Sequence, residues 1–180
     1  MSAMQTSVQL DAAVSDPGVS IRWDSEQRAY VLKTVTCLPK GRAEVFHFFS
    51  DAFQLERITP PWLNFRILTP APIEIGKGCL IDYRIRLRGI PIRWRTEISE
   101  WEPDVRFVDR QLRGPYLLWE HLHVFEEVPE GTLMTDEVRY RVPGGDLIHR
   151  LFVKNDLEKI FSFRQQAMLG IFSSGSGAGV

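Results

Sequence analysis

The stretch Leu80–Ser99, LIDYRIRLRGIPIRWRTEIS, decides how this chain folds. Apolar side chains alternate with charged ones on both sides of the turn at Arg88–Pro91. Because this pattern repeats every two residues, one face of each strand lies in water and the other in the core. Such alternation is typical of antiparallel sheets. The stretch therefore predicts an antiparallel hairpin with one buried face.

Similar segments precede and follow this hairpin. Pro60 and Pro61 end the second of two short expected helices, and an apolar stripe marks a long helix at the end. We expect strands at Ile21–Trp23, Ala29–Leu38, Leu63–Thr69, Leu80–Arg88, Ile92–Trp101, Val105–Leu112, Tyr116–Glu126 and Thr132–Val142, and helices at Arg42–Ser50, Asp51–Ile58 and Asp146–Phe172. The apolar stripe of the last helix, which begins at Leu147 and Leu151, needs a large partner. We therefore predict an α+β fold of order β-α-α-β6-α, in which a curved antiparallel sheet wraps around the C-terminal helix.

The bulk properties are those of one ordinary globular domain. The chain has 180 residues, 44% of them hydrophobic and 25% charged, with a net charge of −1, which gives no indication of nucleic-acid binding. We expect a flexible leader at 1–18, one ligand-binding domain at 19–172 and a flexible tail at 173–180. No secretory signal and no apolar run of about 18 residues is present, which predicts a cytoplasmic protein without stable membrane insertion. The oligomeric state is not determined by these properties.

Several motifs resemble those of one superfamily. They are Val45–Ala52 with Leu55–Pro60, Asp82–Arg84, Gly89–Pro91, Arg93–Thr96 with Trp101–Pro103, Gly114–Tyr116, Trp119–His121 and Gly131–Asp136. Together they resemble the START-like (SRPBCC) helix-grip superfamily, which includes the Bet v type pollen allergens, and in particular its bacterial branch of polyketide cyclase/dehydrase-like and coenzyme Q-binding proteins. The resemblance implies an internal cavity for a hydrophobic small molecule, such as a polyketide, an isoprenoid or a lipid. It carries no shared catalytic motif.

Two histidines are the strongest candidates for chemistry. His121 and His123 are two residues apart on one strand and therefore share a face. Asp136, on the next strand, is expected on the same inner face. A carboxylate beside an imidazole in an apolar cavity can hold the tautomer of the ring and tune its pKa for proton transfer. The alternatives are that these groups orient a ligand, or that they only satisfy one another's hydrogen bonds.

The remaining expected ligand contacts are mostly aromatic. We expect the cavity to be lined by Trp62, Phe65, Tyr83, Trp94, Trp119, His121, His123, Phe125, Met134, Asp136, Tyr140, Leu157, Phe161 and Arg164. Trp62 and Phe65 are placed at its mouth, and Arg164 within reach of an anionic ligand group. No metal and no cofactor is expected, because His47 and His149 are placed on helix faces in water and no third histidine joins His121 and His123.

A row of arginines occupies the expected outer face of the hairpin: Arg84, Arg86, Arg88, Arg93 and Arg95. It is either a docking surface, for an acidic partner, an anionic membrane or a nucleic acid, or a solvated face. In the second case the arginines pair with acids across the strands, with candidates at Asp82, Glu97, Asp109, Glu120 and Glu137. Tyr83 and Trp94 are expected on the opposite face, which argues against stacking on single-stranded nucleic acid.

The leading functional hypothesis is non-catalytic binding or carriage of a hydrophobic small molecule. The alternative is a cyclase or dehydratase that uses His121 or His123 as its base, with Asp136 as the orienting group. A third hypothesis is an adaptor that acts through the arginine face.

Overall fold

The computed structural model of the chain describes residues 18–173. Its strands are β1 (Ser20–Asp24), β2 (Ala29–Leu38), β3 (Arg66–Ile67), β4 (Leu80–Leu87), β5 (Ile90–Glu102), β6 (Arg106–Arg113), β7 (Leu118–Val128) and β8 (Gly131–Arg141). Its helices are α2 (Arg42–Phe49), the 3-10 helices η1 (Ala52–Ile58) and η2 (Pro61–Leu63), α3 (Gly145–Ile148), the π-helical segment η3 (His149–Val153) and α4 (Lys154–Ser173). The expected leader and most of the expected tail lie outside the described residues.

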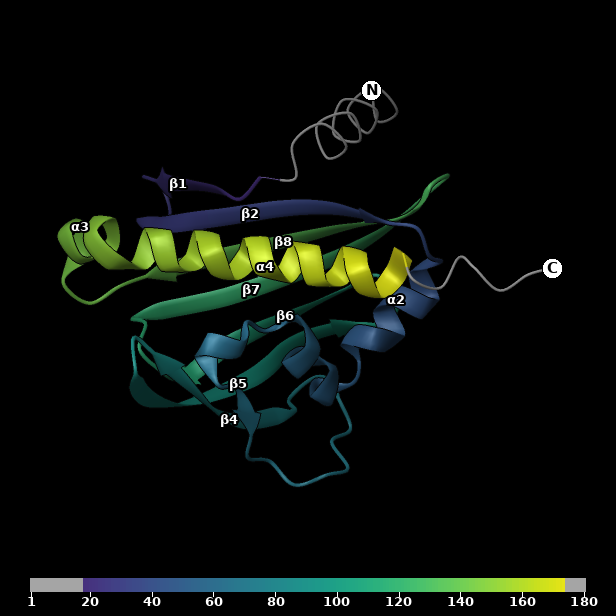
Figure 1. The fold of residues 1–180 in the computed structure, drawn as a ribbon, viewed down its shortest axis with the longest axis horizontal. Helices are drawn as coiled ribbons and strands as arrows, with labels where there is room; N and C mark the ends of the chain where they lie inside the picture. The colour runs from purple at the N-terminus through teal and green to yellow at the C-terminus, as the bar shows by residue number, and fades with distance from the viewer. Residues whose placement is uncertain (1–17, 174–180) are drawn as a thin grey trace.

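All eight strands form one antiparallel sheet in the order β1-β2-β8-β7-β6-β5-β4-β3. The sheet curves around α4, which runs along its concave side beside β2, β8 and β7 (Figure 1). Alternation within the quoted hairpin behaves as predicted, since Ile81, Ile85 and Trp94 are buried while the arginines between them are exposed. The predicted α+β helix-grip architecture is confirmed.

Helix α2 covers one end of the sheet with phenylalanines. Phe46 and Phe49 are buried against Phe125 of β7, with ring centroids 5.3 and 5.4 Å away. Phe172, near the end of α4, belongs to the same apolar cluster. This packing closes one end of the space between the sheet and α4.

The predicted strand at Leu63–Thr69 was too long. Regular pairing with β4 covers Arg66–Ile67, and the backbone N–H groups of Leu68 and Thr69 then both donate to the carbonyl of Asp82. The strand starts late because Pro61 begins a 3-10 turn and Asn64 follows it with a left-handed backbone (φ 43°). Proline sets a backbone angle that suits the start of such a turn. The region around Trp62 and Phe65 is therefore a loop beside the sheet edge rather than a full strand.

The C-terminal helix is not one continuous α-helix. A π-helical segment, His149–Val153, separates α3 from α4. A π turn holds an extra residue and rotates the side chains that precede it relative to those that follow. The expectation that Leu147 and Leu151 continue the buried stripe was therefore wrong, since they are 66% and 58% exposed.

The same rotation turns His149 inward, against the expectation that it faces water. Its side chain is buried, stacks on Tyr30 with ring centroids 3.5 Å apart, and its Nε2 lies 2.9 Å from the hydroxyl of Tyr140. Burial lowers the pKa of His149 below its usual 6.5, and Lys154 adds to this, while Asp146 and Glu158 oppose it. The fold therefore favours the neutral ring.

This buried histidine predicts a pH dependence of stability. Because the unfolded chain binds the proton more readily, the contribution of His149 is complete above pH 6.5 and is lost as the pH falls below that value. We expect His149→Gln to lose less free energy of unfolding between pH 7.5 and 5.0 than the wild type, as measured by urea denaturation. Equal losses in the two proteins would contradict the assignment.

Within the described residues, no helix combines the length and the apolar character needed to cross a membrane.

Candidate functional site: a cavity with one polar end

A cavity of about 180 Å³ lies between α4, the 3-10 helices and the inner face of β4–β7. Its wall is mostly aliphatic and aromatic: Phe49, Leu55, Ile58, Thr59, Leu63, Phe65, Ile75, Ile81, Tyr83, Ile85, Leu87, Trp94, Thr96, Ile98, Phe107, Asp109, Tyr116, Trp119, His121, His123, Leu157, Ile160, Phe161 and Arg164. The size is comparable to the roughly 150 Å³ of an apolar cavity that accepts benzene. The space suits a compact molecule of one or two rings.

Charged side chains gather at one end of this cavity. Strands β6, β7 and β8 are neighbours, and their register places Asp109 opposite His121 and His123 opposite Asp136. His121 and His123 are 6% and 3% exposed. Because side chains alternate along β7, both rings lie on the inner face of the sheet, between two carboxylates.

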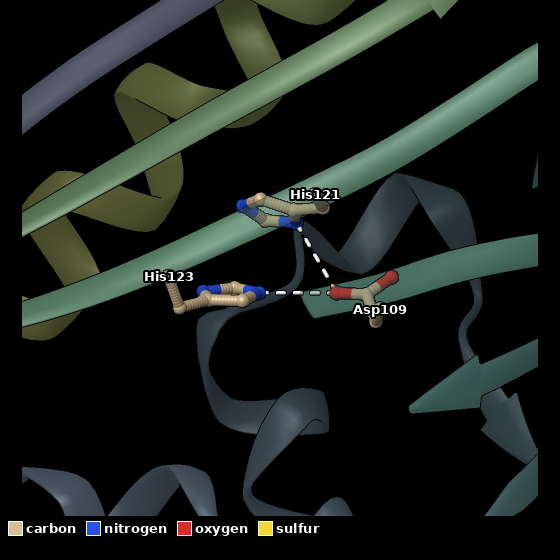
Figure 2. A group of neighbouring side chains, drawn as sticks. All are labelled: Asp109, His121 and His123. Carbon is tan, nitrogen blue, oxygen red and sulfur yellow. Dashed lines mark hydrogen bonds and ion pairs between the residues drawn. The ribbon is translucent and has the colours of Figure 1, made fainter. Parts of the chain in front are cut away.

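The contacts in this cluster form a closed cycle. His121 donates from Nε2 to Oδ1 of Asp136 (2.9 Å), and His123 donates from Nε2 to Oδ2 of Asp109 (3.0 Å). The remaining nitrogens also face carboxylates. His121 Nδ1 lies 3.5 Å from Asp109 Oδ2, and His123 Nδ1 lies 2.8 Å from Asp136 Oδ1 in a direction that makes no hydrogen bond. Figure 2 shows both rings directed at the same oxygen of Asp109.

Arg164 of α4 completes the cluster from the opposite wall. Its Nε lies 3.4 Å from Oδ2 of Asp136, and its guanidinium lies over the ring of Phe49. Nε and Nη2 are buried without a hydrogen-bond partner among the described residues. The indole nitrogen of Trp94, another wall residue, is buried and unpartnered as well. The residues that line the cavity therefore include buried N–H groups without an acceptor.

The four titratable groups shift one another's pKa values. Burial opposes ionisation of Asp136, but Arg164 and the two histidines hold its pKa well below the usual range. Burial likewise opposes ionisation of Asp109, but the two histidines lower its pKa. Burial and the neighbouring His123 lower the pKa of His121 to about 4. Burial opposes protonation of His123, but its close contacts with the carboxylates of Asp109 and Asp136 outweigh burial and raise its pKa.

Most of the residues expected from the sequence border the cavity. Nine do so: Phe65, Tyr83, Trp94, Trp119, His121, His123, Leu157, Phe161 and Arg164. Five do not: Trp62, Phe125, Met134, Asp136 and Tyr140. Trp62 is 56% exposed beside Phe163, and Asp136 lies behind the two histidines. The other three are fully covered core residues of β7 and β8, because α2 and α4 pack directly on them.

Asp109 was placed on the wrong face. It was expected among the acids that pair with the outer arginines, but it shares the inner face of β6 with Phe107. The alternation of Phe107 and Asp109 with Arg106 and Arg110 was a signal for this placement. An acid close to arginines in the sequence is equally typical of a charged surface, so the pattern fits both faces of the strand.

The outer arginine face is partly neutralised. Arg95 makes a bidentate contact with Asp82, Arg110 pairs with Glu97, and Arg88 reaches Asp156 of α4. Glu120 also contacts Arg139 on this face. Among the described residues, no ion pair involves Arg84, Arg86 or Arg93. The expectation of charge pairing across strands thus holds for part of the row.

The sequence matches no protein-family model, and no curated protein matches it either. Solved structures do match. The Zhui aromatase/cyclase from Streptomyces sp. R1128 is 15% identical, with a TM-score of 0.65, over 83% of this chain and 98% of that one. A protein from Arthrobacter aurescens is 14% identical, with a TM-score of 0.65, over 87% of this chain and 92% of that one. Ara h 8.0201, a Bet v 1 allergen homologue, is 13% identical, with a TM-score of 0.57, over 82% and 99%. The chain therefore shares the helix-grip fold of these solved structures, which is the fold that the resemblance of its motifs implied.

Proposed function

We propose that this protein binds a compact hydrophobic molecule that carries at least one oxygen acceptor, such as an aromatic polyketide-type phenol or ketone. The observation that carries the proposal is the apolar cavity with the charged cluster at one end. Binding pockets are mostly apolar, with a few polar groups that orient the ligand. The volume of about 180 Å³ favours one or two rings over an extended isoprenoid or lipid chain.

The unpartnered donors indicate the polar part of the ligand. A buried N–H without a partner is costly, and an acceptor atom supplied by a ligand removes that cost. Arg164 offers such groups in the wall, and Trp94 offers another. A phenol or ketone oxygen fits them, whereas a pure hydrocarbon leaves them unsatisfied. The shared fold with an aromatase/cyclase supports a polyketide-like ring system.

The geometry favours binding over catalysis by a histidine base. Each nitrogen of His121 and His123 already faces Asp109 or Asp136. A base must come within hydrogen-bond reach of the proton that it removes. A ligand could reach either ring only if the cycle of contacts opened, so the cyclase or dehydratase hypothesis needs a rearrangement that binding does not need.

The proposal predicts a preference for an oxygenated ring. We expect 2-naphthol to bind at least tenfold more tightly than naphthalene, because one hydrogen bond to a charged donor contributes about 1.5–3 kcal/mol. Equilibrium dialysis of the chelator-treated protein measures both affinities. Ile85→Trp fills the apolar wall and should abolish binding, while Arg86→Trp, one residue away on the outer face, should leave binding unchanged.

Two outcomes would overturn the proposal. One is an affinity for naphthalene equal to that for 2-naphthol, which would remove the role of the donors. The other is an Ile85→Trp variant that folds, as judged by its urea midpoint, and still binds as the wild type does. That result would place the binding site elsewhere.

A further inference from the structure

We propose that Asp109, His121 and His123 form a binding site for one divalent transition-metal ion at the polar end of the cavity. Two imidazoles and a carboxylate suit ions such as Zn²⁺, Fe²⁺ or Co²⁺ better than Mg²⁺ or Ca²⁺, which prefer oxygen ligands alone. The proposal goes beyond ligand binding, and it does not depend on the identity of any organic ligand.

The three ligand atoms already converge. Asp109 Oδ2 lies 3.0 Å from His123 Nε2 and 3.5 Å from His121 Nδ1, and all three atoms lie within 4.8 Å of one another. Bonds of about 2.0–2.2 Å to zinc separate tetrahedral ligand atoms by roughly 3.3–3.5 Å. An ion therefore needs only small shifts of side chains, which are anchored on the adjacent strands β6 and β7 (Figure 2).

One of these contacts is unfavourable without a cation. A neutral imidazole has a single N–H, and His121 uses it on Asp136. Its Nδ1 therefore presents a lone pair to an oxygen of Asp109, 3.5 Å away. Two acceptors that face each other in a buried site repel, and an ion between them converts the repulsion into two coordinate bonds.

Asp136 supplies the support that metal-binding histidines need. Metal ligands of this type usually donate their second N–H to a carboxylate, which fixes the orientation of the ring. Asp136 serves His121 in this way, because its Oδ1 lies 2.9 Å from His121 Nε2 and accepts a hydrogen bond from it. His123 Nδ1 lies 2.8 Å from the same oxygen, but not in line for a hydrogen bond. An ion bound at His123 Nε2 requires the N–H of that ring to move from Nε2 to Nδ1, and a small turn of the ring then brings Nδ1 in line with Asp136. In that tautomer both rings direct a lone pair at the same point. Arg164 in turn holds Asp136 in place.

The site is open on one side. Asp109, His121 and His123 all border the cavity, whereas Asp136 does not. Three protein ligands with an open position are the arrangement of zinc sites that also bind water or substrate. If the proposed function holds, a ligand oxygen can occupy that position. This second role rests on the proposed function, whereas metal binding itself does not.

Cobalt titration tests the site in the full-length chain. After treatment with a chelator and dialysis, we expect the wild type to take up one Co²⁺ with visible absorption bands of a nitrogen-containing site. Asp109→Asn should weaken binding at least tenfold, because it replaces a charged ligand by an amide of the same shape. His47→Gln and Asp82→Asn remove an exposed histidine and an outer-face carboxylate, and both should leave the affinity unchanged.

Absence of 1:1 binding to the wild type would overturn the proposal, as would wild-type affinity in Asp109→Asn. X-ray absorption of the zinc-loaded wild type is a second readout that needs no variant. Two imidazoles and a carboxylate oxygen around zinc support the site, and fewer than two imidazoles contradict it. Because 2-naphthol binding is measured in metal-free protein, failure of either proposal is recognised independently of the other.

Discussion

Replacing Arg164 with methionine is expected to lower the free energy of unfolding by about 3–5 kcal/mol, the usual cost of removing one partner from a buried ion pair. Only 11% of the Arg164 side chain and 2% of the Asp136 side chain are exposed, so water cannot take over the lost interaction. Urea denaturation in the presence of a chelator measures the effect without a contribution from bound metal.

Most of this loss of stability should come from the unpaired charge of Asp136 rather than from lost packing. Methionine keeps most of the apolar stem of arginine. It loses the guanidinium that lies over the ring of Phe49, but that contact contributes only about 0.5–2 kcal/mol. Asp136→Asn in the Arg164→Met background removes the unpaired carboxylate and should recover part of the stability. A double variant less stable than Arg164→Met would show that Asp136 is needed mainly for its bonds to the histidines.

Replacing Phe125 with alanine is expected to cost about 3–5 kcal/mol, because a large buried ring leaves a cavity that its neighbours cannot fill. Phe125 is 1% exposed and packs against Phe46, Phe49 and Phe107. This cluster joins β6 and β7 to α2 at the closed end of the molecule. The urea midpoint of the variant gives the loss.

Phe53→Ala is the matched control, since Phe53 is 42% exposed. We expect it to change the stability by less than about 0.5 kcal/mol, as surface substitutions usually do. Similar losses in the two variants would mean that the closed end is packed more loosely than its geometry indicates.

The sequence was sufficient to predict the architecture and, for most strands, which side chains face the core. Alternation is a local property of the backbone, because successive side chains of a strand point to opposite faces. It assigned Tyr83 and Trp94 to the inner face and the hairpin arginines to the outer one, and the structure places them there. The single apolar stripe in the C-terminal helix likewise required a sheet as its partner.

Asp136 was expected beside the histidines, whereas the presence of Asp109 there and the start of the last helix became visible only in the folded chain. Alternation divides a strand into two faces but does not fix its register against a neighbour, and β5 pairs with β6 through two irregularities. Asp109 lies in the cluster because β6 pairs with β7, and Arg164 lies there because α4 packs against the sheet. The π turn at His149–Val153 was equally hidden, because it adds one residue to a helix whose composition does not change.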